Sequence, residues 1–195
     1  MAEEGEGKLW QRARNGDHGA FDALQRKLEA PVRRFVVRLL GRQADAVDEV
    51  MQDAFLALYR NRSHITSADH LRPFLYRVAR NLCYDAHRRR ARRPDVPLGE
   101  SDDQGPLPLE PRPAPDDAVT WGILYSEVQK AIDKLPEPQR QALVLHSQQD
   151  LSYEQIAEAT ATDINTVKSR IFHGRKKLRR ILRPDVLEAL GIRKE

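Results

Sequence analysis

A proline-rich and acidic stretch, residues 94–117, interrupts this chain of 195 residues. It contains seven of the twelve prolines together with two glycines, and Arg112 is its one basic residue against seven acidic ones. Proline removes backbone hydrogen-bond donors, and the stretch offers too little apolar area to offset the ordering of its backbone. We therefore expect a linker, disordered when free, that joins two separately folded domains.

The charge of the chain is distributed unevenly across this division. The whole sequence carries +4 and the linker alone −6, so the remaining residues carry +10. Such an excess indicates a polyanionic partner for the folded parts. The linker would repel that partner; it either lies along a basic protein surface or is an inert spacer.

The composition favours an all-α protein of two small helical domains. Apolar residues make up 40% of the chain, aromatic residues 6%, and there are ten glycines, which argues against an all-β fold. The single cysteine, Cys83, excludes an internal disulfide and falls on the apolar face of a predicted helix, so we expect a packed thiol. No apolar run approaches membrane-spanning length and the acidic N-terminus lacks a signal sequence, so we expect a cytoplasmic protein without membrane insertion.

The clearest helical periodicity lies between residues 47 and 58. Its apolar positions fall three and four apart and predict one buried helix face: Val47, Val50, Met51, Ala54, Phe55 and Leu58. The other faces carry Asp45, Asp48, Glu49, Gln52 and Asp53. This acidic surface is either a protein-docking site or the ordinary preference of acidic residues for the first turns of a helix.

Further helices are predicted on both sides of this one. A short helix over 8–14 precedes one that starts near Phe21, restarts at Pro31 and stops at Gly41. After a polar loop over 61–69, Asp69 is placed to cap a helix that runs to about residue 93. That helix carries eight arginines, with Tyr76, Asn81 and Tyr84 between them. Such a mixture suits phosphates and exposed bases, although a lone Asn or Tyr on a helix is usually an ordinary surface or core residue.

The segment from Leu151 to Leu178 is predicted to form a helix, a tight turn and a second helix. Ser152 and Gln155 have the spacing of a capping box, and Asp163 is placed to cap the second helix. Between Ile164 and Pro184 there is no acidic residue but eight Lys and Arg. A short helix that is packed on one side and basic on the other suits the DNA major groove. Two helices over 117–134 and 137–147 lead into it, the first with Val119, Ile123 and Leu124 inward.

No catalytic constellation is present in the sequence. The six histidines show no metal-ligand spacing with each other or with Cys83, and there is neither a Gly-rich phosphate loop nor a Ser nucleophile motif. We therefore expect no cofactor, no metal and no enzymatic activity; a nuclease, which would need a metal-carboxylate cluster, is disfavoured.

Three strings of residues, in this order, resemble the sigma-70 family of bacterial RNA polymerase. DEVMQDAF (48–55) resembles region 2.2, FLYRVARNLCYDAHRRR (74–90) regions 2.3 and 2.4, and residues 134–179 region 4. The size and layout are similar to the extracytoplasmic-function (ECF) sigma factors. The resemblance implies an N-terminal segment over 1–17, region 2 over 18–93, the linker over 94–117, region 4 over 118–184 and a tail over 185–195.

The resemblance also implies a role for each matched surface. Polymerase core would bind through its β′ clamp helices and β flap, and the clamp-binding residues are Asp48, Glu49, Gln52, Asp53 and Phe55. The −10 promoter element would contact Asn61, Tyr76, Arg77, Arg80, Asn81, Arg88, Arg89 and Arg90, with Asn81 holding a flipped base. The −35 element would contact Thr166, Lys168, Ser169, Arg170, Phe172, His173 and Arg175. The linker would thread the active-site cleft and RNA exit channel, and an anti-sigma factor would regulate the protein.

Several positions depart from the family pattern. Ala161 and Asn165 stand where glycine is common, and His173 stands where arginine is frequent. A left-handed Ala161 would cost on the order of 1 kcal/mol, and histidine cannot read guanine bidentately as arginine does. The −35 sequence is therefore not transferable from relatives. The alternative function is a stand-alone helix-turn-helix transcription regulator that binds duplex DNA without polymerase and needs neither the acidic 48–53 surface nor the linker.

Overall fold

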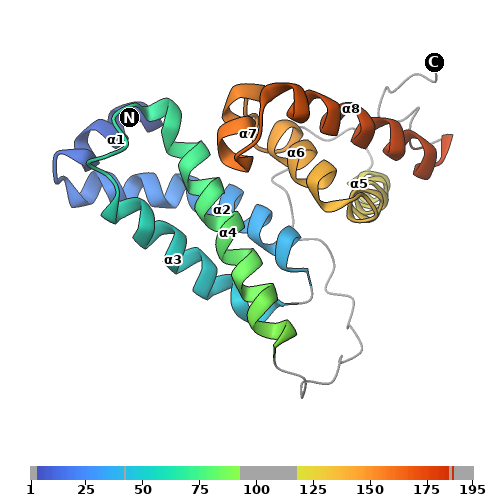
Figure 1. The fold of residues 1–195 in the computed structure, drawn as a ribbon, viewed down its shortest axis with the longest axis horizontal. Coiled ribbons are helices and arrows are strands. Elements are labelled where there is room, and N and C mark those ends of the chain that lie inside the picture. The colour runs from blue at the N-terminus through green and yellow to red at the C-terminus, as the bar shows by residue number, and fades with distance from the viewer. Residues whose placement is uncertain (1–3, 42, 93–117, 185, 187–195) are drawn as a thin grey trace.

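The structure is a computed structural model that describes residues 4–41, 43–92, 118–184 and 186. The described residues form two groups of helices (Figure 1). The first group comprises α1 (Glu6–Arg14), α2 (His18–Leu40), α3 (Val47–Arg60) and α4 (Leu71–Ala91), with short 3-10 turns η1 (Ala44–Ala46) and η2 (Ala68–His70). The second comprises α5 (Ala118–Asp133), α6 (Glu137–Ser147), α7 (Tyr153–Thr160) and α8 (Ile164–Ile181). The prediction of an all-α protein with two helical domains is confirmed. The predicted linker lies outside the described residues, as does the predicted tail apart from Val186, which is buried.

Helix α2 runs without a break through Pro31, so the predicted restart at this residue is wrong. A proline inside a helix removes one backbone hydrogen bond and strains the preceding turn. Leu28 and Val32 on its two sides are both fully buried in one core, together with Phe35. Packing of this continuous apolar face holds the helix together across the proline.

Helix α3 buries the apolar face that the periodicity predicts, from Val47 to Leu58. Asp69 was predicted to cap α4, and this prediction is wrong. The helix begins at Leu71, and no side chain makes a capping hydrogen bond there. Instead, Ser67 accepts a hydrogen bond from the amide of Asp69 and opens the turn η2. The turn η2 leads directly into α4, and the Asp69 carboxylate is exposed.

The helix-turn-helix of the second group forms as predicted. Ser152 and Gln155 make both bonds of the capping box, and the Asp163 side chain accepts from the Thr166 amide at 2.8 Å. Ala161 adopts the left-handed conformation, with φ of 53° and ψ of 48°. The predicted inward residues at the start of α5 lie among side chains that the structure does not describe, whereas Ala131 and Ile132 farther along are buried.

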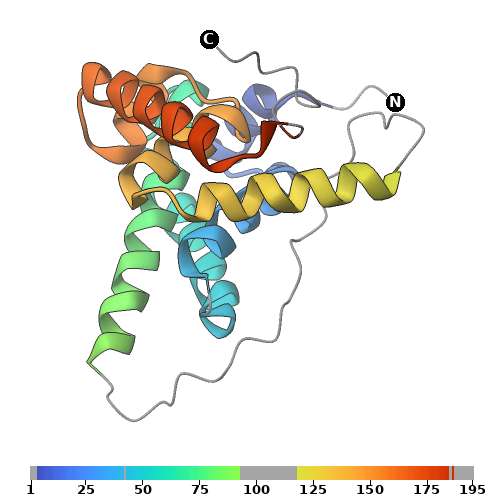
Figure 2. The ribbon, with the colours of Figure 1, turned by 90° about the vertical axis from the view of Figure 1, so that its right-hand side faces the viewer.

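The two groups pack against each other through α4 and α7. In Figure 2 the first turns of α4 lie against the second group, and the last turns extend away from it. Among the hydrogen bonds that join the groups near this contact are three made at residues of α4. They are donated by Tyr76 to the Gln149 side chain at 2.7 Å, by Arg72 to the Gln149 carbonyl at 3.2 Å, and by Gln141 to the Tyr84 hydroxyl at 2.7 Å.

Candidate nucleic-acid interface

Helix α8 presents a cationic face to solvent. Its buried side consists of Val167, Ile171 and Gly174, and a Cβ added to Gly174 would lie 3.6 Å from Gln139 of α6. Five of the predicted −35 residues are exposed: Lys168, Ser169, Phe172, His173 and Arg175. Phe172 is an exposed large apolar residue, 62% accessible, and its ring is open to contact by a partner.

The remaining two predicted −35 residues are less available. Thr166 hydrogen-bonds to Asp163 in the cap of α8, and this contact holds the pKa of the Asp163 carboxyl below its usual range. Arg170 is half-buried and lies close enough to Arg80 of α4 for their charges to interact. Burial, and then the nearby charges of Arg170 and Arg77, lower the pKa of Arg80 on α4. The two basic helices therefore repel each other locally in this arrangement.

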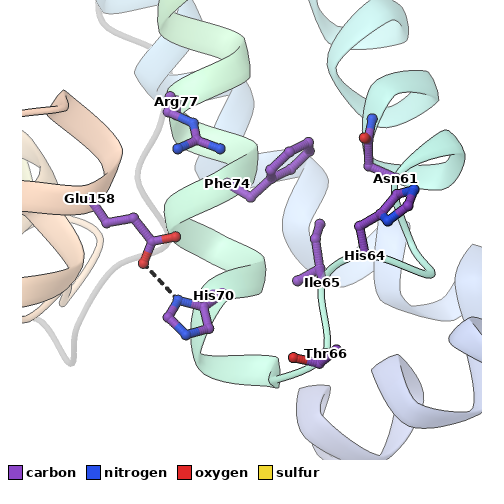
Figure 3. A pocket seen from close by; sticks show the side chains of 8 residues that line it. All are labelled: Asn61, His64, Ile65, Thr66, His70, Phe74, Arg77 and Glu158. Atoms are coloured by element: carbon purple, nitrogen blue, oxygen red, sulfur yellow. Dashed lines mark hydrogen bonds and ion pairs between the residues drawn. The ribbon is translucent and has the colours of Figure 1, made fainter.

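A cavity of about 280 Å³ opens between the end of α3, the following loop and the first turns of α4 (Figure 3). Eight residues line it: Asn61, His64, Ile65, Thr66, His70, Phe74, Arg77 and Glu158. The Arg77 guanidinium lies 5.5 Å from the centroid of the Phe74 ring. An aromatic face, a cation and amide and imidazole groups around one hollow suit a planar polar ligand such as a nucleobase.

Glu158 reaches this cavity from α7, in the other group of helices. Its carboxylate is 2.7 Å from Nδ1 of His70, the one interaction drawn in Figure 3. Gln155, one turn earlier on α7, donates to the Asp69 carbonyl at 3.3 Å. An acidic side chain at the mouth of the cavity disfavours a nucleic-acid backbone there as long as α7 stays in place.

The predicted −10 residues are dispersed rather than gathered at this cavity. Only Asn61 and Arg77 line it. Tyr76 is buried under the second group, while Asn81 is exposed and accepts a hydrogen bond from Arg80 at 3.3 Å. The other three lie farther along α4: Arg88 pairs with Asp85, Arg89 pairs with Glu49 of α3, and Arg90 is half-buried. Phe74 was not among the predicted site residues, although it lines the cavity and its spacing of three from Arg77 could have indicated that place.

The acidic surface of α3 is exposed on the first group. The side chain of Asp48 is 84% accessible although it pairs with Arg33 at 2.8 Å, and Gln52 and Asp53 are exposed. Phe55 is buried and supports this surface from below. Leu56, which was not among the predicted clamp-binding residues, is an exposed apolar residue beside this acidic surface. An apolar residue within an acidic patch is typical of a protein-docking surface.

Two kinds of feature are missing from the described residues. No group of three or more His, Cys, Asp and Glu among them could hold a metal ion. Within the same part of the chain, no helix has the length and apolar character needed to cross a membrane.

Comparison with known proteins matches both groups of helices. The sigma-70 region 2 family matches residues 24–93, and the sigma-70 region 4 family matches residues 125–178. The RNA polymerase sigma-H factor of Pseudomonas aeruginosa is 32% identical over 97% of this chain and 100% of its own length. The ECF RNA polymerase sigma factor SigW of Bacillus subtilis is 34% identical over 90% of this chain and 96% of its own length.

Solved structures agree on the fold. CnrH in complex with the cytosolic domain of CnrY has a TM-score of 0.62 and 22% identity, covering 90% of this chain and 95% of that one. The sigma factor RpoE of Bartonella quintana, in complex with the anti-sigma factor NepR, has a TM-score of 0.59 and 23% identity, covering 82% and 96%.

The fold and its surfaces therefore define a class of protein, a helical DNA-binding subunit with two domains. The chain belongs to the sigma-70 family. Its relatives place it among the ECF RNA polymerase sigma factors. The prediction of an ECF sigma factor is confirmed, and it is preferred to the alternative of a stand-alone helix-turn-helix regulator. The roles of individual residues stay predictions.

Proposed function

We propose that this sigma factor joins bacterial RNA polymerase core and directs it to promoters with two spaced elements, one for each domain. The observation that carries the proposal is that the two domains offer nucleic-acid surfaces of different chemistry. The first has a cavity lined by Phe74 and Arg77, and the second has the exposed face of α8, which carries Lys and Arg and no acidic residue. A cavity suits a base removed from its stack, whereas a cationic helix suits the groove of a duplex.

The cavity is the proposed site for promoter opening. Unstacking a base costs a few kcal/mol, roughly, and a pocket that receives the extruded base offsets this cost. His64 and the side-chain oxygen of Asn61 offer hydrogen-bonding groups on one wall, because the Asn61 amide nitrogen donates to the Ala57 carbonyl, and Phe74 offers an aromatic surface on the other. Arg77 and Asn81 are four residues apart on α4 and share a face, so the melted strand would run from the cavity along that face.

The acidic surface of α3 is the proposed contact with the β′ clamp helices, while region 4 would contact the β flap. Asp48, Glu49, Gln52 and Asp53 offer carboxylates and an amide in a chain that is otherwise basic. Such a surface repels promoter DNA and attracts a basic protein surface. Polymerase supplies the chemistry, so the sigma factor needs no catalytic residue, and it would act in the cytoplasm where polymerase and chromosome meet.

The packing of α7 on α4 would prevent DNA from binding to the first domain. Glu158 stands at the mouth of the cavity, and Tyr76 is covered by the second group. The two domains must separate before promoter DNA can use both surfaces. An anti-sigma factor that stabilises the packed arrangement would keep the protein inactive, and the solved structure of RpoE from Bartonella quintana is itself a complex with the anti-sigma factor NepR.

Run-off transcription with purified bacterial core polymerase tests the proposed function. Added sigma factor should produce discrete new start sites on a genomic promoter pool, all preceded by the same pair of spaced elements. Duplex binding by the free protein, without any core-dependent initiation, would contradict the proposal.

A further inference from the structure

Helix α1 belongs to the first domain although it precedes residue 24, where the region 2 match begins. Leu9 and Trp10 are buried in the same core as α2, α3 and α4, and Trp10 has no accessible surface. Packing alone would explain apolar residues here. It does not explain the polar contacts that α1 makes with the loop between α3 and α4.

Two side chains of α1 donate hydrogen bonds to consecutive carbonyls of that loop. Nε1 of Trp10 donates to the carbonyl of Ile65 at 3.2 Å, across 55 residues of sequence. Nη1 of Arg14 donates to the carbonyl of Thr66 at 2.9 Å. The two donors are four residues apart and therefore lie on one face of α1, directly opposite the loop.

The two carbonyls belong to one wall of the cavity. Ile65 and Thr66 both line it, in a segment with neither helix nor strand. The start of the loop is fixed by its own backbone, because the amides of His64 and Ile65 donate to the Asn61 carbonyl at 3.0 and 3.3 Å. The bonds from α1 hold the two carbonyls that follow.

Helix α1 also contacts α4, the helix that carries the opposite wall. Glu6 accepts two hydrogen bonds from Arg72 at the start of α4, at 2.6 and 2.9 Å. That first part of α4 carries His70 at its entry and then Phe74 and Arg77, which line the other side of the cavity. A single rigid helix thus sets the distance between the two walls.

We propose that α1 is the positioning element of the cavity, and that Trp10 and Arg14 hold the loop at the spacing an extruded nucleobase requires. This role rests on the proposed function of the cavity. Irregular loops without such anchors sample many conformations, and a pocket that closes around one planar ring needs a fixed width. Trp10 and Arg14 do not touch the base; they act through the backbone of Ile65 and Thr66.

Three variants separate this role from general stability. Arg14→Met keeps the aliphatic stem and removes the donors, and Trp10→Phe keeps an aromatic ring and removes the N–H group. Arg12→Met is the matched control, because Arg12 is on the same helix but contacts Asp17 and Glu4 rather than the loop. Each full-length variant is assembled with core polymerase. The probes are labelled single-stranded non-template oligonucleotides that span the −10 element of a promoter opened by the wild type, either intact or abasic at one position at a time.

The wild-type holoenzyme should lose affinity when one particular base is removed. We expect Arg14→Met and Trp10→Phe to bind the intact oligonucleotide about fivefold to tenfold more weakly, the effect of losing one well-formed hydrogen bond, and to be nearly insensitive to the abasic substitution. Arg12→Met should behave as the wild type, and the affinity of Arg14→Met for core should be unchanged.

The outcomes distinguish the two levels of the proposal. If Arg14→Met and Trp10→Phe lose as much affinity as the wild type when that base is removed, the role of α1 is wrong, while base capture by the cavity still stands. An equal loss of core affinity and oligonucleotide affinity in both variants would also overturn it, because that result indicates general unfolding. A wild type that is indifferent to every abasic position would overturn base capture by the cavity itself.

Discussion

The hydroxyl of Tyr76 donates a hydrogen bond to the side-chain oxygen of Gln149 at 2.7 Å, in a buried contact between the two domains. Tyr76 also packs edge-on against Phe35, with ring centroids 5.1 Å apart. The Gln149 amide nitrogen is buried without a hydrogen-bond partner. The Gln149 side chain is therefore held by its bond to Tyr76, and burial raises the pKa of the Tyr76 hydroxyl, which keeps it protonated as a donor.

Replacing Tyr76 by Phe should favour separation of the domains. The ring packing is kept, but Gln149 loses its buried partner, which costs about 1 kcal/mol and raises the opening equilibrium about fivefold. Hydrogen exchange of the α7 amides measures this equilibrium, and they should exchange about fivefold faster. Tyr59→Phe is the control, because Tyr59 lies on α3 beside His18 and Phe21. Equal α7 exchange in both variants would show that the Tyr76 bond does not hold the domains together.

Asn61 and Asn81 should both contribute to promoter opening, by contacting different parts of the melted strand. Asn61 lines the cavity and Asn81 is exposed on α4 outside its lining. Each Ala variant should slow open-complex formation about fivefold to tenfold, the effect of losing one hydrogen bond to DNA. Permanganate reactivity of unpaired thymines follows the rate. If Asn81→Ala opens promoters at the wild-type rate, the melted strand does not depend on Asn81, and both its predicted hold on a flipped base and its place on the strand path are wrong.

Phe172 and Ile171 are neighbours on α8 with opposite environments. Ile171 is 2% exposed and Phe172 is 62% exposed. Ile171→Ala should lower the free energy of unfolding by about 2–5 kcal/mol, whereas Phe172→Ala should leave it nearly unchanged and weaken −35 recognition. Urea unfolding and holoenzyme binding to −35 duplexes measure the two effects. A large loss of stability in Phe172→Ala would mean that its side chain packs in the free protein.

Ala161 carries backbone strain in the turn of the helix-turn-helix. A left-handed alanine costs about 1–2 kcal/mol, and glycine removes that cost but adds about 0.5–1 kcal/mol of conformational entropy to lose on folding. Ala161→Gly should therefore raise the free energy of unfolding by about 0.5 kcal/mol. Ala30→Gly, on the exposed side of α2, should lower it by about 1 kcal/mol. Denaturant titration measures both, and a loss of stability in Ala161→Gly would contradict the strain argument.

Cys83 should make stability depend on pH in the alkaline range. Burial raises the pKa of its thiol from 9.0 to about 12. The unfolded thiol ionises first, so the stabilisation is complete below pH 9 and is lost by up to about 1.4 kcal/mol per pH unit as pH rises toward 12. The difference in unfolding free energy between the wild type and Cys83→Ala isolates this effect from other titrating groups. A difference that stays constant between pH 8 and 11 would contradict it.

Local features were read correctly from the sequence because they depend on neighbours a few residues apart. The apolar stripe of α3, the capping box at Ser152 and the cap at Asp163 involve residues three or four positions apart, the spacing at which helical side chains meet. The break predicted at Pro31 and the cap predicted at Asp69 failed because tertiary packing and the turn η2 outweighed these local preferences.

The sequence by itself determined that this chain is helical, that it has two domains, and that it resembles a sigma factor, since caps, periodicity and family strings are all local patterns. Only the tertiary structure decided the contacts between distant residues. Tyr76 meets Gln149 across 73 residues, Trp10 meets Ile65 across 55, and His70 meets Glu158 across 88. Such pairs form where separate helices pack, and no spacing within one helix specifies which partner each side chain finds.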